Sequence, residues 1–213
     1  MKKIKISSLQ AFLTVLFVVC LLISNIIAGK VIQLPFDITM TSAVIVFPIT
    51  YILSDVFSEV YGYKWSRLTC YLAFTMNLFM VIIFTLSIKI PAAVWWSNQG
   101  AFEIVLGNTP RILLASLSGF VIGDFINDNV FKKLKEKHPN NQKGFGFRAI
   151  LSSLTGQAID SAIFLPIAFF GQMPLQALFI MAVTQITLKV LYEIIILPVT
   201  TLVVKKVANY ESV

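Results

Sequence analysis

The stretch LQAFLTVLFVVCLLISNIIA, residues 9–28, decides the fold class of this protein. It contains no charged side chain, and it has the length of about 20 mostly apolar residues that a helix needs to cross a bilayer. The basic segment at residues 1–5 resembles the start of a signal peptide, but no small-x-small cleavage site closes the run, and similar runs follow. Residues 9–28 are therefore predicted to be retained as a first transmembrane helix.

Five more apolar runs follow along the chain. Their predicted helical ranges are 38–59, 67–88, 110–131, 148–170 and 175–204. The more polar segment 89–109, with Trp95 and Trp96, is typical of an interfacial loop or of a short helix lying on the membrane, and 132–147 is predicted to be a hydrophilic loop. The sequence thus predicts an all-α polytopic membrane protein with six transmembrane helices, forming one transporter domain over 1–213.

The composition agrees with this class. Of the 213 residues 57% are hydrophobic and 13% are charged, whereas soluble domains carry roughly a quarter charged residues. The net charge of +7 could suit a nucleic-acid partner, but the basic residues cluster beside apolar runs. They are interpreted as topology signals, and no nucleic-acid partner is expected.

The distribution of Lys and Arg predicts the orientation, because cytoplasmic loops are enriched in these residues. If the N-terminus is inside, only Lys30, Lys89 and Arg111 of the 17 basic residues lie on the outer side, and Lys189 lies within the last helix. All the others flank the inner ends of the predicted helices. Both termini are therefore predicted to be cytoplasmic.

Several ionisable side chains interrupt the apolar runs. Such a residue at the centre of a spanning helix costs about 2.5 to 3.5 kcal/mol on insertion scales, so each one requires an explanation. Asp160 lies near the middle of the fifth predicted helix. Three pairs are spaced four residues apart and so share a helical face: Asp55 and Glu59, Asp124 and Asp128, and Lys189 and Glu193. The pattern predicts polar faces that point into a helix bundle, which is typical of a transporter.

Some of these charges also have a purely structural interpretation. Lys189 and Glu193 can partly neutralise each other, and Asp55 and Glu59 can be hydrated residues at the cytoplasmic boundary. Harder to explain in this way are the carboxylates of Asp124, Asp160 and Glu193.

Neutral polar and aromatic side chains could complete a binding surface. Gln157 lies three residues before Asp160 and therefore on the same helical face, and Asn25 adds an amide from the first helix. Phe47, beside Pro48, could stack on a flat ligand. The alternative is that such polar groups only hold helices together.

Other kinds of chemistry find no support in the sequence. No Gly-rich phosphate loop with Lys-Ser/Thr occurs, and the single histidine, His138, falls in the basic loop, where it cannot build a zinc site alone. Cys20 and Cys70 lie in apolar runs without metal or redox spacing. We therefore expect no enzyme activity, no cofactor and no metal.

Three motifs carry a resemblance to a known family. They are SNI at 24–26, SDVFSEVYG at 54–62 after FPIT at 47–50, and GQAIDS at 156–161, and the segment KVLYE at 189–193 before Pro198 is similar as well. These motifs resemble the queuosine precursor transporter family, also called the vitamin uptake transporter family. The resemblance covers all six predicted helices and implies a prokaryotic plasma membrane location. It also implies uptake of a 7-deazaguanine base, the cyano or aminomethyl precursor of queuosine.

A guanine-like base has features that the polar residues could recognise. Its adjacent N–H donors suit a carboxylate, its carbonyl suits an amide or a lysine, and its flat faces suit an aromatic ring. Asp160, Glu193 or Asp124 are the candidate acceptors, and Gln157, Asn25 and Lys189 are the candidate edge partners. The complete set of candidate substrate-binding residues is Asn25, Phe47, Asp55, Glu59, Asp124, Gln157, Asp160, Lys189 and Glu193.

Two functional alternatives remain open at this stage. The leading hypothesis is a secondary transporter or facilitator in the bilayer that needs no ATPase module and is compatible with a homo-oligomer. The alternative is the substrate-binding subunit of an energy-coupling-factor vitamin transporter. The first helix lacks the Ala-x-x-x-Ala docking pattern of such subunits, but Ala158 and Ala162 place one on the fifth.

Overall fold

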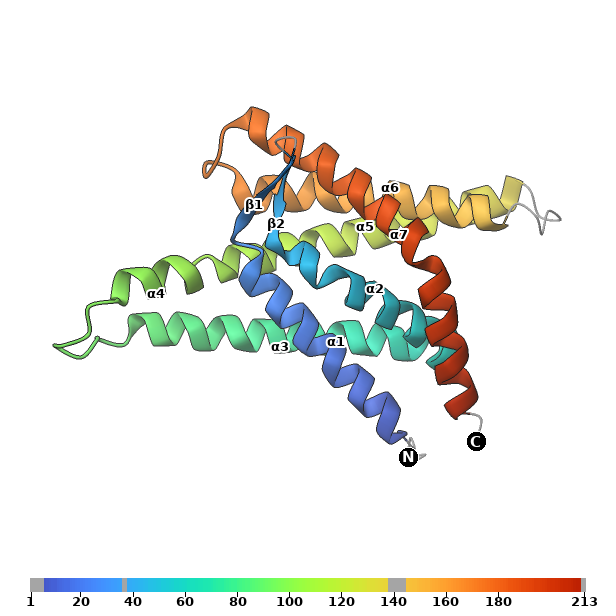
Figure 1. Ribbon diagram of the computed structural model, residues 1–213, viewed down its shortest axis with the longest axis horizontal. Coiled ribbons are helices and arrows are strands. Elements are labelled where there is room, and N and C mark those ends of the chain that lie inside the picture. The colour runs from blue at the N-terminus through green and yellow to red at the C-terminus, as the bar shows by residue number, and fades with distance from the viewer. Residues whose placement is uncertain (1–5, 36–37, 138–144, 212–213) are drawn as a thin grey trace. The chain divides into compact units, whose positions relative to one another are not determined.

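The computed structural model describes residues 6–35, 38–137 and 145–211 (Figure 1). Its internal contacts divide the chain into two compact units. Unit 1 consists of Met1–Lys30, Thr41–Thr109 and Tyr192–Val213, and unit 2 consists of Val31–Met40 and Pro110–Leu191.

Helix α1 (Ser8–Ile27) opens unit 1 and covers nearly the predicted range 9–28. Its first turn is closed by a capping box, in which the Ser7 hydroxyl accepts the Gln10 N–H at 2.9 Å and the Gln10 side chain accepts the Ser7 N–H. At the other end, the Ser42 hydroxyl donates to the carbonyl oxygen of Ile27, which has no partner within the helix. Both ends of this apolar helix are therefore satisfied by local side chains.

The prediction of a helix over 38–59 is wrong for the first part of that range. Strands β1 (Val31–Leu34) and β2 (Ile38–Thr41) pair in a two-stranded sheet, and the short 3-10 helix η2 (Ser42–Ile45) follows. Helix α2 (Phe47–Val56) begins only at Phe47. The β-branched residues in 38–41 favour a strand, and Pro48 fits the first turn of a helix, where its missing N–H is not needed.

A π-helical segment, η3 (Phe57–Tyr61), continues α2 and ends at Gly62. Gly62 has φ = 82°, in the left-handed region that favours glycine, and it starts the long helix α3 (Tyr63–Lys89). Within the predicted interfacial segment 89–109 the chain forms one short helix, α4 (Gln99–Leu106). These elements all belong to unit 1.

The core of unit 1 is formed by α1, α2, η3, α3 and the end of α7. Phe17 packs edge-on against Phe57, with ring centroids 5.7 Å apart, and both side chains are buried. The wider cluster includes Leu13, Ala73 and Val207. Because Val207 lies near the end of the chain, the last turns of α7 complete the core that α1 begins.

A polar cluster joins the two ends of the chain at the edge of this core. The Glu211 carboxylate accepts the Ser7 hydroxyl at 2.5 Å and the Tyr61 hydroxyl at 2.9 Å. Burial and the adjacent Glu211 carboxylate raise the pKa of the Tyr61 phenol above its usual value. Tyr61 therefore stays protonated at physiological pH and keeps donating to Glu211.

Unit 2 is built mainly from three long helices. They are α5 (Thr109–Lys137), α6 (Phe145–Phe169) and the part of α7 (Leu175–Glu211) that ends at Leu191. Gly171, with φ = 79°, lies in the tight turn between α6 and α7. An L side chain at Gly171 would be strained, so this residue fixes the turn.

Helix α5 also extends into the segment 132–147 that was predicted to be a loop. It continues through Lys137, because the Lys, Leu and Glu residues of 132–137 are strong helix formers even though they are too polar for the bilayer core. The residues 138–144 lie outside the described part of the chain, and so does His138. The end of the apolar run 110–131 is thus the limit of the residues that suit the bilayer core, whereas helix α5 itself continues to Lys137.

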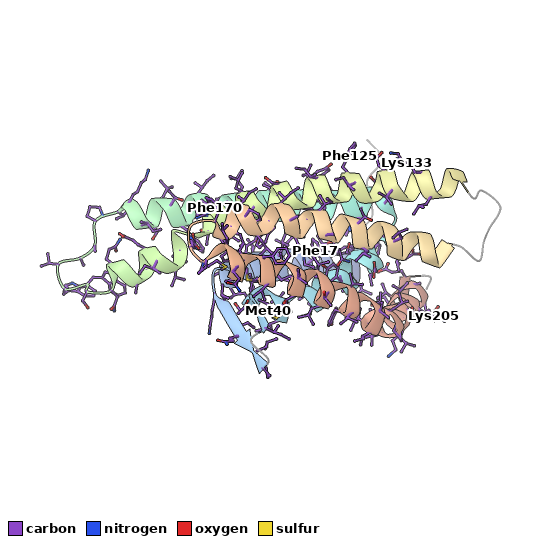
Figure 2. The ribbon with its side chains drawn as sticks, turned by 90° about the horizontal axis from the view of Figure 1, so that it is seen from above. Phe17, Met40, Phe125, Lys133, Phe170 and Lys205 are labelled. Atoms are coloured by element: carbon purple, nitrogen blue, oxygen red, sulfur yellow. The ribbon has the colours of Figure 1, made fainter. Side chains whose placement is uncertain are left out.

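Four segments of the described chain are long and apolar enough to cross a membrane, namely Ser8–Ile27, Tyr63–Lys89, Gln99–Gly123 and Leu175–Tyr192. Leu154–Phe169 is a shorter apolar helix. Many large apolar side chains are exposed, such as Phe125, which points away from α5, whereas Phe17 lies among packed side chains (Figure 2). These features agree with the predicted helical, polytopic membrane class; the count of six spans and the orientation stay predictions.

Arg111, near the start of α5, closes the C-terminal end of α6. Its Nε donates to the carbonyl oxygen of Ile167 at 2.5 Å and its Nη2 donates to that of Phe170 at 2.6 Å. Carbonyl groups in the last turn of a helix lack partners within the helix, so the guanidinium group satisfies them. We expect Arg111→Ala to destabilise the protein by about 1.5 kcal/mol, since hydrogen bonds to charged groups contribute roughly this much.

Thermal unfolding of the detergent-purified protein, followed by far-ultraviolet circular dichroism, checks this expectation. Arg111→Lys should also lower the melting temperature, because an ammonium group cannot reproduce the two-pronged contact. Lys30→Ala, which removes an exposed cation, is the control and should leave it unchanged. A melting temperature of Arg111→Ala equal to that of the wild type would contradict the capping role.

Candidate functional site

Two glycines on α5 bring this helix close to α6 beside Asp160. A Cβ atom at Gly119 would lie 2.6 Å from the Asp160 Oδ1 and 2.9 Å from the Asp160 carbonyl oxygen. At Gly123 it would lie 2.8 Å from the carbonyl oxygen of Gly156 and 3.1 Å from the Asp160 Cβ. Gly119 and Gly123 thus form a small-xxx-small contact, which lets two helices approach closely in a membrane. The contact sets the position of Asp160.

Asp160 is bound to α7 by an ion pair. The Lys189 Nζ lies 2.8 Å from the Asp160 Oδ2 and 3.4 Å from the Ser161 hydroxyl, to which it also donates. The Lys189 side chain is 11% exposed and that of Asp160 is 28% exposed. The pair is therefore largely shielded from the surroundings, although part of the Asp160 side chain stays exposed.

The same sides of α6 and α7 are buried above the ion pair. On α6 the buried residues Ser161, Leu165 and Ala168 recur at helical spacing. On α7 the buried residues Leu178, Met181 and Gln185 lead with the same spacing to Lys189. Both helices thus have an inward face, and the ion pair lies on it.

Gln185 is a polar residue on this inward face that the sequence interpretation missed. Its side chain is 6% exposed, and its Nε2 has no hydrogen-bond partner among the described residues. It precedes Lys189 by four residues and therefore lies one helical turn away on the same face. The four-residue spacing from Lys189 could have identified Gln185 as a candidate site residue. A single glutamine, however, carries no charge that would mark it in the sequence.

Two predicted site residues of unit 2 are brought together in this region. Asp160 and Lys189 are in direct contact, and Gln157 lies three residues before Asp160 on α6. Gly119 and Gly123 were not predicted, although their four-residue spacing in an apolar helix is a recognisable packing motif. The contact of Asp160 with Lys189 joins two candidate substrate-binding residues, and their role in binding stays a prediction.

Three predicted residues cannot be placed by their side chains. Phe47, Asp124 and Glu193 lie in α2, α5 and α7, but their side chains are outside the described part of the structure. The local neutralisation of Lys189 by Glu193 therefore stays a prediction. The structure adds that Lys189 has a carboxylate partner on α6.

Asp55 and Glu59 lie in unit 1 and are exposed. Asp55 is in α2, whereas Glu59 is in the π-helical segment η3. A π turn closes i→i+5 hydrogen bonds, so the four-residue spacing no longer fixes a common face for this pair. Such π segments are frequent at functional sites, and the two carboxylates stay candidates.

Asn25 has a structural partner in unit 1. Its Nδ2 donates to the Asn77 Oδ1 at 2.7 Å, and the Asn77 Nδ2 donates to the carbonyl oxygen of Ala73 at 2.9 Å. Both asparagine side chains are buried. The pair joins α1 to α3 and accounts for part of the hydrogen-bonding capacity of Asn25 that the sequence interpretation gave to a ligand.

We expect Asn25→Leu and Asn77→Leu each to destabilise unit 1, because each leaves a buried amide without its partner. A double-mutant cycle on thermal or denaturant unfolding should give a coupling energy of about 0.6 kcal/mol, the average for interhelical hydrogen bonds in membranes. A coupling energy of zero would argue against this contact. Normal substrate binding by Asn25→Leu would restrict Asn25 to this structural role.

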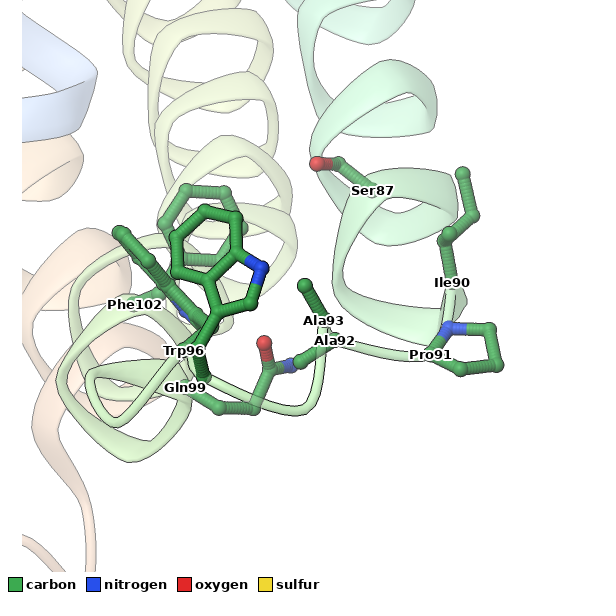
Figure 3. A pocket seen from close by; sticks show the side chains of 9 residues that line it. Ser87, Ile90, Pro91, Ala92, Ala93, Trp96, Gln99 and Phe102 are labelled. Carbon is green, nitrogen blue, oxygen red and sulfur yellow. The ribbon is translucent and has the colours of Figure 1, made fainter.

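A shallow pocket of about 280 Å³ lies in unit 1 where α3 leads into α4. The rings of Trp96 and Phe102 lie on one side of it and Ile90 and Pro91 on the other (Figure 3). Its one amide, Gln99, already donates to the Ile88 carbonyl oxygen and to Glu103. None of the predicted site residues lines the pocket, and no charged side chain does so. It therefore lacks the polar groups that a guanine-like base requires.

Comparison with known proteins gives two positive findings. A family model described as "Putative vitamin uptake transporter" matches residues 41–203. A protein of Bacillus subtilis (strain 168) named "Probable queuosine precursor transporter" is 24% identical over 188 residues, which make up 88% of this chain and 81% of that protein. No solved structure matches the chain.

The family match includes the whole polar region of unit 2. Gly119, Gly123, Asp160, Gln185 and Lys189 all fall within residues 41–203, whereas Asn25 lies before them. The matched part of the chain thus contains the Asp160–Lys189 ion pair and the glycines packed beside it.

Proposed function

Since this chain belongs to the vitamin uptake transporter family, we propose that it imports a 7-deazaguanine precursor of queuosine, in the cyano or aminomethyl form, as a secondary transporter or facilitator. The family and the Bacillus subtilis relative are described as transporters, so the chain is a membrane transporter and not an enzyme. The resemblance seen in the sequence motifs is confirmed at this level. The substrate and the mechanism are our proposal.

The ion pair of Asp160 with Lys189 is the observation that carries the proposal. A carboxylate can accept the two adjacent N–H groups of a guanine-like ring in a bidentate manner, and the Asp160 side chain is partly exposed. The ammonium group of Lys189, 2.8 Å away, can then donate to the neighbouring ring carbonyl. One acidic and one basic side chain thus match the donor and acceptor edge of the base.

Binding in this way exchanges partners without leaving a charge unpaired. In the structure Lys189 donates to both Asp160 and Ser161. When the base donates to Asp160, Lys189 keeps its proximity to the carboxylate and gains the ring carbonyl as an acceptor. An unpaired buried charge would cost several kcal/mol, so this exchange keeps the energy of the loaded site low.

The other predicted residues have secondary roles in this proposal. Gln157 extends the polar face of α6. Phe47, in unit 1, stays a candidate stacking residue. The remaining candidate substrate-binding residues stay predictions, each considered within its own unit: Asn25, Asp55, Glu59 and Glu193 in unit 1, and Asp124 in unit 2.

We also propose six transmembrane spans with both termini in the cytoplasm of a prokaryotic cell. The four long apolar segments, the shorter helix Leu154–Phe169 and the α2 region supply the spans. The bias of Lys and Arg supports the orientation.

Reconstituted protein tests the function directly. Purified protein in liposomes without ATP should bind and take up radiolabelled 7-cyano- or 7-aminomethyl-7-deazaguanine, and empty liposomes should not. Absence of both binding and uptake would reject the substrate. Repeating the uptake with and without a proton gradient separates coupled transport from facilitated diffusion.

The second candidate is a substrate-binding subunit of an energy-coupling-factor transporter. Ala158 and Ala162 lie four apart on α6, and Ala162 is exposed, as a docking surface for a partner helix would be. This candidate predicts binding without uptake in ATP-free liposomes. It also predicts co-purification with a large membrane subunit and ATPases, which the leading proposal does not need.

A further inference from the structure

We propose that Gln185 reads the substituent at the 7-position of the base and makes the transporter prefer the cyano form over the aminomethyl form. The inference rests on the proposed function and deepens it. It begins from the buried amide nitrogen of Gln185, which has no hydrogen-bond partner among the described residues. A buried donor left without a partner is unfavourable, so a ligand that supplies an acceptor is favoured there.

The order of the polar groups matches the order of groups along the base. Asp160 contacts Lys189, and Gln185 lies four residues before Lys189 on the same face of α7, a rise of about 6 Å. Along one edge of a 7-deazaguanine, the adjacent N–H donors are followed by the ring carbonyl and then by the 7-substituent. With the donors on Asp160 and the carbonyl on Lys189, the 7-substituent points toward Gln185.

The environment of Gln185 selects between the two substituents. The cyano group ends in a nitrogen that accepts a hydrogen bond and carries no charge, which suits a free amide N–H. The aminomethyl group is an ammonium at neutral pH and offers only donors. The apolar neighbours on this face of α7, Leu178 and Met181, provide nothing that compensates a second cation beside Lys189.

Binding of three probes to purified wild-type and variant proteins tests the inference. The probes are 7-cyano-7-deazaguanine, 7-aminomethyl-7-deazaguanine and unsubstituted 7-deazaguanine. Wild type should bind the cyano form most tightly. Gln185→Leu should weaken binding of the cyano form by roughly tenfold and leave the unsubstituted base unchanged. Gln185→Glu should reverse the preference toward the aminomethyl form, because a carboxylate accepts from an ammonium in a charge-assisted bond.

The readout is the ratio of affinities within one protein, which does not depend on the fraction of protein that is folded. Gln176→Leu is the matched control, since Gln176 is an exposed glutamine on the same helix, and its ratios should equal those of the wild type. Equal weakening of all three probes by Gln185→Leu, or unchanged ratios in both Gln185 variants, would overturn the inference. Failure of the wild type to bind any probe would instead overturn the proposed function.

Discussion

Asp160→Asn should abolish substrate binding, with a loss of affinity of about a hundredfold or more. Asparagine keeps the size of the side chain but replaces one acceptor oxygen by an NH2 donor, so it cannot pair one oxygen with each of the two adjacent N–H groups of the base. In the wild type the ammonium group of Lys189 lies 2.8 Å from an Asp160 carboxylate oxygen. The substitution removes this negatively charged partner. Removing one partner of a hydrogen-bonded charge pair costs about 2 to 5 kcal/mol when the pair is fully buried and less when it is partly exposed, and roughly 3 kcal/mol corresponds to a hundredfold.

Equilibrium binding of labelled 7-deazaguanine derivatives to the purified protein measures this loss. The unpaired lysine could also impair folding, so the double variant Asp160→Asn with Lys189→Met is the second arm. It restores a neutral pair and should recover the melting temperature but not the binding. Wild-type affinity in Asp160→Asn would remove this carboxylate from the binding site.

Gly119→Ala should have the second largest effect, because it changes the position of Asp160 without changing its chemistry. The added methyl group would lie 2.6 Å from the Asp160 Oδ1 and 2.9 Å from its carbonyl oxygen. The carboxylate can turn away, but the backbone of α6 must shift as a whole. Inserting a methyl group into a packed contact costs about 1 to 3 kcal/mol, so we expect at least a tenfold loss of affinity and a lower melting temperature.

Gly100→Ala is the matched control for this substitution. Gly100 is also a helical glycine, in α4, but a Cβ atom there would have no neighbour within 4 Å. This variant should bind and melt like the wild type. Gly119→Val should exceed the effect of Gly119→Ala. If Gly119→Ala retains both affinity and stability, α5 and α6 do not need this close approach.

The class of the fold and part of the site could be predicted from the sequence because hydrophobicity and charge act over short distances. A charge-free run such as 9–28 has few alternatives to a spanning helix, and Asp160 and Lys189 stand out because ionisable groups are rare in such runs. The identity of the carboxylate partner of Lys189 could not be predicted. Glu193 is closer in sequence, whereas Asp160 becomes a neighbour only through the turn at Gly171.

The prediction that the second helix starts at residue 38 was wrong for a related reason. A run of apolar residues can form either a strand or a helix, so the hydropathy of residues 38–46 did not indicate the strand β2. Pro48 contained the missing information, since a proline in the first turn places a helix start at Phe47. Gln185 was missed because an uncharged side chain shows its importance only through its burial and its unpaired amide, which a sequence does not report.

The contact of Ser7 with Glu211 constrains the order in which the protein assembles during synthesis. These residues are 204 positions apart, and their hydrogen bond helps to close unit 1. Unit 2, by contrast, takes almost all its residues from the continuous segment Pro110–Leu191. Its helices can therefore pack together once Leu191 has been added and before the rest of α7 is made. Helix α1 is made first, but its contacts with Val207 and Glu211 can form only after the last turns of α7 have been translated.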